Sequence, residues 1–226
     1  MYTLYIGNKN YSSWSLRGWL AAKLSGAPFR EVHVPLVGKG PNPANRTFSP
    51  SGLVPCLHDG DTIVWDTFAI AEYLAERHPG MWPGEPRARA FGRSIAAEMH
   101  SGFPALRSEM SMCIRERVDV RPWSEDLQGN IDRVTMLWNE ARARFGNGGD
   151  FLLGAFSLAD CFYAPVVFRF QTYLVDPEGA ARDYLHAMLA HPYVGEWQQA
   201  ALAETVTIEA DEPRVIYRDK LDGRAA

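Results

Sequence analysis

The chain has 226 residues, of which 46% are hydrophobic and 22% are charged, and its formal net charge is −4. A globular chain of this length buries enough apolar surface to fold without a metal or a disulfide staple. Because phosphate binding needs clustered cations, the acidic balance and the lack of a basic tract argue against a nucleic-acid partner.

The start of the chain and its cysteines predict a cytoplasmic protein. Residues 1–10 lack the charged and apolar regions of a secretory signal. The longest mostly apolar stretch, residues 161–168, is too short to span a bilayer, which takes about 20 helical residues. The three cysteines form no C-x-x-C pair, and the six histidines show no zinc-binding spacing. We therefore expect no disulfide, no metal site and no membrane association.

The first 78 residues predict a small unit of strands and helices. Aromatic and β-branched residues, or alternating apolar and polar ones, predict strands over 2–6, 29–34, 54–58 and 62–65. Apolar residues at helical spacing predict one helix over residues 16–24 and a second around residues 70–74. Residues 35–53 contain four Pro and three Gly and predict a long loop. The predicted order is β-α-β, loop, β-β-α.

The residues after this unit predict helices only. Residues 79–87 contain three Pro and two Gly and are the best candidate for a linker. Helical spacing of apolar residues, or a capping residue before such a run, predicts helices over 91–99, 131–145, from Ser157 onward, 178–190 and 193–204. The sequence therefore predicts an α/β domain over 1–78, a linker over 79–87 and an all-helical domain over 88–226.

The segment Y-S-S-W-S-L-R-G-W-L over residues 11–20 is the first of four patterns that resemble the cytosolic glutathione S-transferases. It is similar to the S-S-x-S-x-R segment of serine-type members, especially the zeta class. The resemblance implies that Ser12, five residues before Arg17, hydrogen-bonds the glutathione thiolate, with Ser13 as the alternative. The competing interpretation is that these serines only cap a helix.

Two further patterns resemble the glutathione site of that family. In S-P-S-G-L-V-P-C-L over 49–57, Val54-Pro55 stands where the family has a cis bond that exposes the valine backbone to the peptide of glutathione. In W-D-T-F-A-I-A-E-Y-L over 65–74, Asp66-Thr67 replaces the family's Glu-Ser. The hydroxyl and the helix N-terminus there would receive the γ-glutamyl carboxylate. A strand-start proline and an ordinary N-cap are the respective alternatives.

The fourth pattern, F-L-L-G-A-F-S-L-A-D-C-F-Y-A-P over 151–165, contains a capping box of Ser157 and Asp160. In the family this box begins a buried helix of the second domain and serves folding. Within the long loop of the first domain, the resemblance implies that Lys39 or Arg46 binds the glycine carboxylate, and the sequence does not separate them.

The resemblance also implies that the second domain forms the pocket for an acceptor substrate. The candidates, each of which could instead be a core residue, are Trp14, Met99, Phe103, Arg107, Arg169 and Tyr173. Glu98 and His100 lie where family members can reach glutathione across a dimer interface, although a solvated helix face is the favoured interpretation.

The resemblance as a whole implies a thioredoxin-like α/β domain joined to an all-α helical bundle. Such an enzyme takes glutathione as co-substrate, adds it as a thiolate to a small electrophile without a metal, and forms a homodimer. One alternative is a glutathione-dependent isomerase or dehalogenase of the same fold, and another is a non-catalytic interaction module. Gly52-Leu53 departs from the zeta pattern, and the lack of cysteine in residues 11–15 disfavours the thiol-transferase branches.

Overall fold

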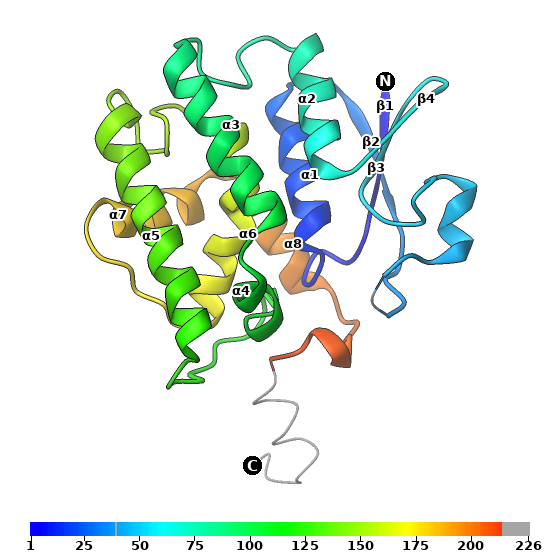
Figure 1. Ribbon diagram of the computed structural model, residues 1–226. Coiled ribbons are helices and arrows are strands. Elements are labelled where there is room, and N and C mark those ends of the chain that lie inside the picture. Colours follow the sequence, from blue (N-terminus) through cyan, green and yellow to red (C-terminus); the bar gives the residue numbers. More distant parts are fainter. Residues whose placement is uncertain (39, 214–226) are drawn as a thin grey trace, which may run out of the picture.

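A computed structural model describes residues 1–38 and 40–213 of the protein (Figure 1). Its first part consists of β1 (Tyr2–Ile6), α1 (Ser13–Leu24), β2 (Phe29–His33), the 3-10 helix η1 (Pro43–Thr47), β3 (Cys56–Asp59), β4 (Thr62–Trp65) and α2 (Thr67–Arg77). The strand order is β2-β1-β3-β4, with β1 and β2 parallel and the other two pairs antiparallel. This mixed sheet confirms the predicted thioredoxin-like architecture.

The sheet is positioned by the alternation of its central strand. Tyr2, Leu4 and Ile6 of β1 are buried, while the two residues between them are only half-buried. Figure 1 shows α1 and α2 between the sheet and the helices of the second part. The parallel β1–β2 pair requires a crossover, which α1 provides. As a result, the N-terminus of α1 lies at the carboxyl end of β1.

The second part is helical, as predicted. It contains α3 (Pro86–Ser101), α4 (Pro104–Glu109), α5 (Glu125–Phe145), α6 (Leu158–Thr172), α7 (Ala180–Ala190) and α8 (Pro192–Ala203), followed by the 3-10 helix η2 (Glu209–Asp211). The short α4 was not predicted, because six residues are too few to show a helical period. Helix α3 begins inside the expected linker, because Pro86 fits its first turn and Glu85 caps it.

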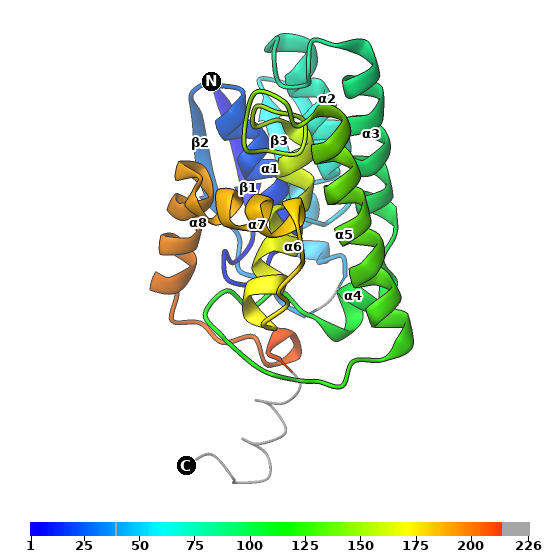
Figure 2. The same ribbon diagram turned by 90° about the vertical axis from the view of Figure 1, so that its left-hand side faces the viewer.

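Helix α6 is the centre of the molecule. All of its residues except Gln171 are buried, as expected for a helix that is apolar on every side. It packs against α1, α3 and α7, and Figure 2 shows α6 and α7 between α8 on one side and α5 on the other. The predicted capping box is confirmed, with the Asp160 carboxylate accepting hydrogen bonds from the backbone N–H groups of Ser157 (2.8 Å) and Leu152 (3.1 Å).

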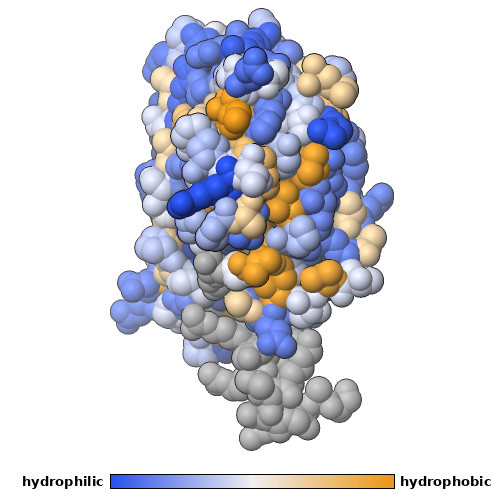
Figure 3. Space-filling view, turned by 90° about the vertical axis from the view of Figure 1, so that its right-hand side faces the viewer, coloured by the Kyte–Doolittle hydropathy of each residue, from blue (hydrophilic) through white to orange (hydrophobic). Residues whose placement is uncertain are grey.

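The two parts share one hydrophobic core that extends from Leu4 through Leu20 to Trp138. Arg17 of α1 enters this core, and its Nε donates to the Phe162 carbonyl oxygen of α6 at 3.1 Å. Figure 3 looks onto the side of the α/β domain, where apolar side chains gather. Within residues 1–38 and 40–213, no helix is long and apolar enough to cross a membrane.

Candidate active site

A cavity of about 610 Å³ lies between the sheet domain and the helices. This volume falls in the range of pockets that bind small molecules. The β1–α1 loop, the loop before β3 and the β4–α2 turn line it from one domain, and residues 107–109, 111–112 and 210–212 line it from the other. Nine of the predicted site residues line this cavity: Ser12, Ser13, Trp14, Val54, Pro55, Asp66, Thr67, Arg107 and Arg169.

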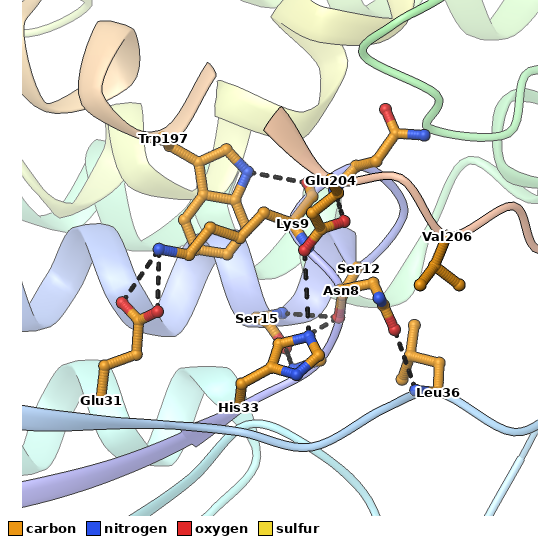
Figure 4. Close-up of polar contacts among 12 residues, drawn as sticks. Asn8, Lys9, Ser12, Ser15, Glu31, His33, Leu36, Trp197, Glu204 and Val206 are labelled. Carbon is orange, nitrogen blue, oxygen red and sulfur yellow. Dashed lines mark hydrogen bonds and ion pairs between the residues drawn. The ribbon is translucent and has the colours of Figure 1, made fainter. Parts of the chain in front are cut away.

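Ser12 caps the N-terminus of α1 and is almost fully buried. Its Oγ accepts a hydrogen bond from the Ser15 backbone N–H at 3.3 Å and donates to the Ser15 Oγ at 2.7 Å. The Ser15 Oγ also accepts from the Gly7 backbone N–H at 2.9 Å. Figure 4 shows the two serine side chains facing each other. Ser12 therefore does cap the helix, and its hydroxyl lies at the positive end of the α1 dipole.

The loop that carries Ser12 is held from the far end of the chain (Figure 4). The Glu204 carboxylate, just after α8, accepts hydrogen bonds from the backbone N–H groups of Lys9 (2.7 Å) and Asn10 (3.1 Å). Trp197 of α8 donates to the Lys9 carbonyl oxygen at 3.0 Å, and the Asn8 side chain accepts from the Leu36 N–H at 3.0 Å. These contacts fix the backbone immediately before Ser12.

Ser13, the alternative thiolate donor, also lines the cavity. Its backbone N–H donates to the Tyr11 carbonyl oxygen at 3.0 Å. Within the described part of the chain, its hydroxyl makes no hydrogen bond. Both candidate hydroxyls therefore border the same space, and the choice between them stays a prediction.

Val54 and Pro55 lie beside the N-terminal half of α1. The peptide bond between them is cis, and Pro55 packs so closely on Gly18 that a Cβ there would lie 2.9 Å from its ring. The backbone N–H and C=O of Val54 form no hydrogen bond with any of the described residues. They are therefore available to pair with an extended peptide in the cavity.

Asp66 and Thr67 form the turn between β4 and α2. Asp66 caps α2, with its Oδ1 accepting from the Phe68 backbone N–H at 2.8 Å, and has a φ of 71° that is uncommon for a residue other than glycine. Its Oδ2 lies 3.3 Å from the His100 Nε2, and the Thr67 Oγ1 lies 3.4 Å from the His100 Nδ1. The hydrogen bond from His100 lowers the pKa of Asp66.

His100 does not lie on a solvated helix face, contrary to the favoured interpretation of the sequence. Its side chain is 23% exposed and faces Asp66 and Thr67 of the same chain. Glu98 points elsewhere and forms a two-bond ion pair with Arg133 of α5 (2.7 and 2.9 Å). The sequence could not separate these two residues, because the helical position of His100 relative to the β4–α2 turn depends on how the domains pack.

Three of the proposed acceptor-pocket residues are core residues instead. Met99, Phe103 and Tyr173 are buried and do not line the cavity, and the Tyr173 hydroxyl is hydrogen-bonded to Ser111 at 3.1 Å. Of the two candidates for the glycine carboxylate, Arg46 is exposed and does not line the cavity. Lys39 lies outside the described residues.

The helical wall of the cavity is rich in arginine. Arg107 and Arg169 line it, and the guanidinium groups of Arg17 and Arg107 lie 4.8 and 5.1 Å from the centroid of the Trp14 ring. Burial lowers the pKa of Arg169 to about 10, with a further contribution from Arg107. The Nη1 and Nη2 atoms of Arg17 are buried without a hydrogen-bond partner among the described residues. This wall therefore favours anionic groups.

The C-terminal segment supplies residues that the sequence did not indicate. Ala210, Asp211 and Glu212 line the cavity. The Tyr11 hydroxyl donates to the Glu212 Oε1 at 2.5 Å, and burial together with this bond raises the pKa of Tyr11 to about 12. The two residues are 201 positions apart in the chain, and no local pattern could have paired them.

Both parts of the chain are similar to known proteins. The family models for the glutathione S-transferase N-terminal and C-terminal domains match residues 11–77 and 121–200. A zeta-class glutathione S-transferase from Euphorbia esula is 39% identical over 164 residues, covering 69% of this chain and 71% of that protein. A stringent starvation protein A homolog from Pasteurella multocida is 28% identical over 149 residues, covering 64% of this chain and 65% of that protein.

The fold is also found among solved structures. Maleylacetoacetate isomerase from Methylobacterium extorquens AM1, crystallised with malonate and glutathione, matches with a TM-score of 0.66 and 23% identity, covering 91% of this chain and all of that one (100%). The two domain models and the 39% identical zeta-class relative show that the chain belongs to the glutathione S-transferase family.

Proposed function

We propose that the protein is an enzyme that binds glutathione in this cavity, stabilises its thiolate and directs it at a small electrophile. The observation that carries the proposal is the convergence of three elements on one cavity. These are the Ser12 hydroxyl at the N-terminus of α1, the unpaired backbone of Val54, and the Asp66-Thr67 turn at the N-terminus of α2.

Ser12 is proposed to donate the hydrogen bond that stabilises the thiolate. A free thiol has a pKa of about 8.5, so roughly 3% is ionised at pH 7, and a decrease of about two units raises that fraction to around three-quarters. The Ser12 hydroxyl donates to Ser15 in the structure. Because Ser15 also carries a hydroxyl proton, it can reverse this bond by donating to the Ser12 Oγ, which turns the Ser12 proton toward the sulfur.

The remaining groups match the rest of glutathione. The Val54 N–H and C=O, which bond to none of the described residues, are proposed to pair with the peptide in the manner of an added strand. The Asp66 carboxylate suits the γ-glutamyl ammonium, and the Thr67 hydroxyl with the α2 N-terminus suits its carboxylate. Asp66 is one methylene shorter than the glutamate of the family pattern, and its positive φ is part of what determines where its carboxylate lies.

Glutathione-dependent isomerisation of an unsaturated acid is the second candidate function. The specific observation in its favour is the pair Arg107 and Arg169 on the acceptor side of the cavity, since guanidinium groups bind carboxylates. The likeness to a maleylacetoacetate isomerase supports the same choice. The likeness to a stringent starvation protein A homolog keeps the interaction module as a third candidate.

The decisive experiment measures the thiolate directly. Titrating the protein with glutathione at pH 7 is expected to produce a saturable ultraviolet thiolate band, and Ser12→Ala is expected to reduce the band about tenfold or more, because a charge-assisted hydrogen bond is lost. Ser94→Ala is the matched control, since this α3 hydroxyl is exposed and bonds only to the Ala90 carbonyl oxygen among the described residues.

The outcome separates the candidates. Loss of the band in Ser13→Ala but not in Ser12→Ala would reassign the donor to Ser13. If glutathione does not bind saturably at millimolar concentration, the proposed enzyme function is wrong and the interaction module is favoured. We further propose that the enzyme acts as a homodimer in the cytoplasm, which sedimentation of the purified protein and fractionation of the cells test separately.

A further inference from the structure

His100 connects the two residues that are proposed to hold the γ-glutamyl group. Its Nε2 lies 3.3 Å from the Asp66 Oδ2, and its Nδ1 lies 3.4 Å from the Thr67 Oγ1. With 23% of its side chain exposed, it can exchange protons with solvent while it stays in contact with both partners. The inference drawn from this arrangement rests on the proposed function.

Asp66 determines which nitrogen of the neutral His100 ring carries the proton. An ionised carboxylate only accepts hydrogen bonds, so Nε2 must carry the hydrogen that faces it. The neutral ring then leaves Nδ1 as an acceptor. The Thr67 hydroxyl, which has a single proton, is then the group that can donate to Nδ1. While it makes this bond, Thr67 can only accept a hydrogen bond from a ligand.

Protonation of His100 reverses the bond to Thr67. The Nδ1–H of the imidazolium donates to the Thr67 Oγ1, and the hydroxyl proton becomes available to the cavity. A carboxylate in the cavity needs a donor, and in this state Thr67 provides one without giving up its bond to His100. We propose that His100 is a positioning residue whose protonation turns Thr67 into a hydrogen-bond donor and so strengthens binding of the γ-glutamyl carboxylate.

The surroundings of His100 contain charges of both signs. The aromatic rings in contact with the His100 ring are those of Trp14, Phe68 and Phe162. Two cations lie nearby: Arg17 contacts the Trp14 and Phe162 rings, and Arg107 donates a hydrogen bond to the His100 carbonyl oxygen. Besides Asp66, the nearby carboxylate is Glu98 on the same helix, which is paired with Arg133. The ligand head group is itself a zwitterion. A positive charge on His100 therefore attracts the carboxylate of the head group and repels its ammonium, and these two effects oppose each other. We expect the reversal of the hydrogen bond between His100 and Thr67 to determine the change in affinity.

The test uses S-methylglutathione, because its thioether does not ionise and the thiol therefore contributes no pH dependence. Between pH 5.5 and 7.0 its carboxylates stay ionised and its ammonium stays protonated. Isothermal titration of the full-length protein is expected to show a Kd that rises roughly three- to tenfold across this range as one hydrogen bond to a charged group is lost.

Two variants assign the effect. His100→Gln keeps a donor and an acceptor but does not titrate, and Thr67→Val removes the hydroxyl with little change in shape. Both are expected to bind with a Kd that does not change over this pH range. His186→Gln is the matched control, because this histidine is exposed on α7, and it should keep the full pH dependence.

The results separate two failures. Equal pH dependence in the unmutated protein and in His100→Gln, or none in the unmutated protein, would overturn the role of His100 and leave the proposed function standing. No binding of the probe by the unmutated protein at any pH would overturn both. A folded His100→Gln variant with a pH-independent Kd, confirmed by its circular dichroism, would support the inference.

Discussion

At the scale of single residues, the buried arginines are the feature that most limits the choice of acceptor substrate. The chain has a net charge of −4, yet Arg107 and Arg169 line the helical wall of the cavity, and the buried Arg17 of α1 lies behind the cavity-lining Trp14, 4.8 Å from its ring centroid. Burial of a guanidinium is costly unless an anion or several acceptors compensate it. Among the described residues, Arg169 donates to two neutral acceptors, the carbonyl oxygens of Met110 (2.7 Å) and Pro165 (3.3 Å).

Replacement of Arg169 by Gln tests whether this wall binds a carboxylate. For a cis-enoyl acid we expect kcat/KM to fall about 30-fold, the equivalent of one charge-assisted contact of roughly 2 kcal/mol. The rate with a neutral electrophile and the affinity for glutathione should change much less. Steady-state kinetics with both substrate types measure this difference, and equal losses for both would contradict a carboxylate-binding role.

At the scale of elements, helix termini position most of the chemistry and much of the stability. α1 and α2 are capped by Ser12 and Asp66, which both line the cavity, so both N-termini lie at the cavity. α6 begins at the Ser157–Asp160 box, which no ligand would contact because both residues are buried away from the cavity. The same local signal, a polar cap before an apolar run, therefore lies at the cavity in two helices and inside the folded core in the third.

Removal of the Asp160 side chain is expected to destabilise the protein. Asp160→Ala leaves the buried N–H groups of Leu152 and Ser157 without their acceptor, so the free energy of unfolding should fall by about 2–3 kcal/mol. Urea denaturation measures this change. Asp176→Ala, which removes an exposed ion pair with Arg182, is the control and should cost less than about 0.5 kcal/mol. An equal decrease in the free energy of unfolding in the two variants would contradict a specific contribution of the capping box to stability.

At the scale of the whole molecule, the two domains are not independent. They share one core, and the Arg17 side chain of α1 donates a hydrogen bond to the Phe162 carbonyl oxygen of α6. The end of α8 returns to the β1–α1 loop through Glu204. The predicted domain limits therefore describe the order of the elements along the chain.

The shared core predicts cooperative unfolding. Urea titrations followed by tryptophan fluorescence and by far-ultraviolet circular dichroism should give the same midpoint, because Trp19 of α1 and Trp138 of α5 belong to one packed cluster. Two separated transitions would contradict this and would indicate that the α/β part unfolds on its own.

Local sequence patterns were sufficient for the order of the strands and long helices, for the three segments that line one side of the cavity, and for the α6 capping box. Each of these depends on residues a few positions apart, where periodicity and capping act. They were not sufficient for α4, whose single turn and a half shows no period, or for the separation of Met99, Phe103 and Tyr173 from the cavity.

The contacts that complete the site join residues far apart in the chain: His100 with Asp66 and Thr67, Tyr11 with Glu212, and Glu204 with the backbone of Lys9. A helical pattern shows that one face of α3 is buried, but not which side chain of that helix faces another domain's turn. Which side chain faces the turn depends on how α1 and α6 pack and on where α3 then lies. The volume of the core and the crossing angles of the helices determine this packing, and no short segment of the sequence encodes them. The family and the sheet-domain half of its candidate site could therefore be predicted from the chain, whereas the contacts of His100 and of the C-terminal segment depend on tertiary packing.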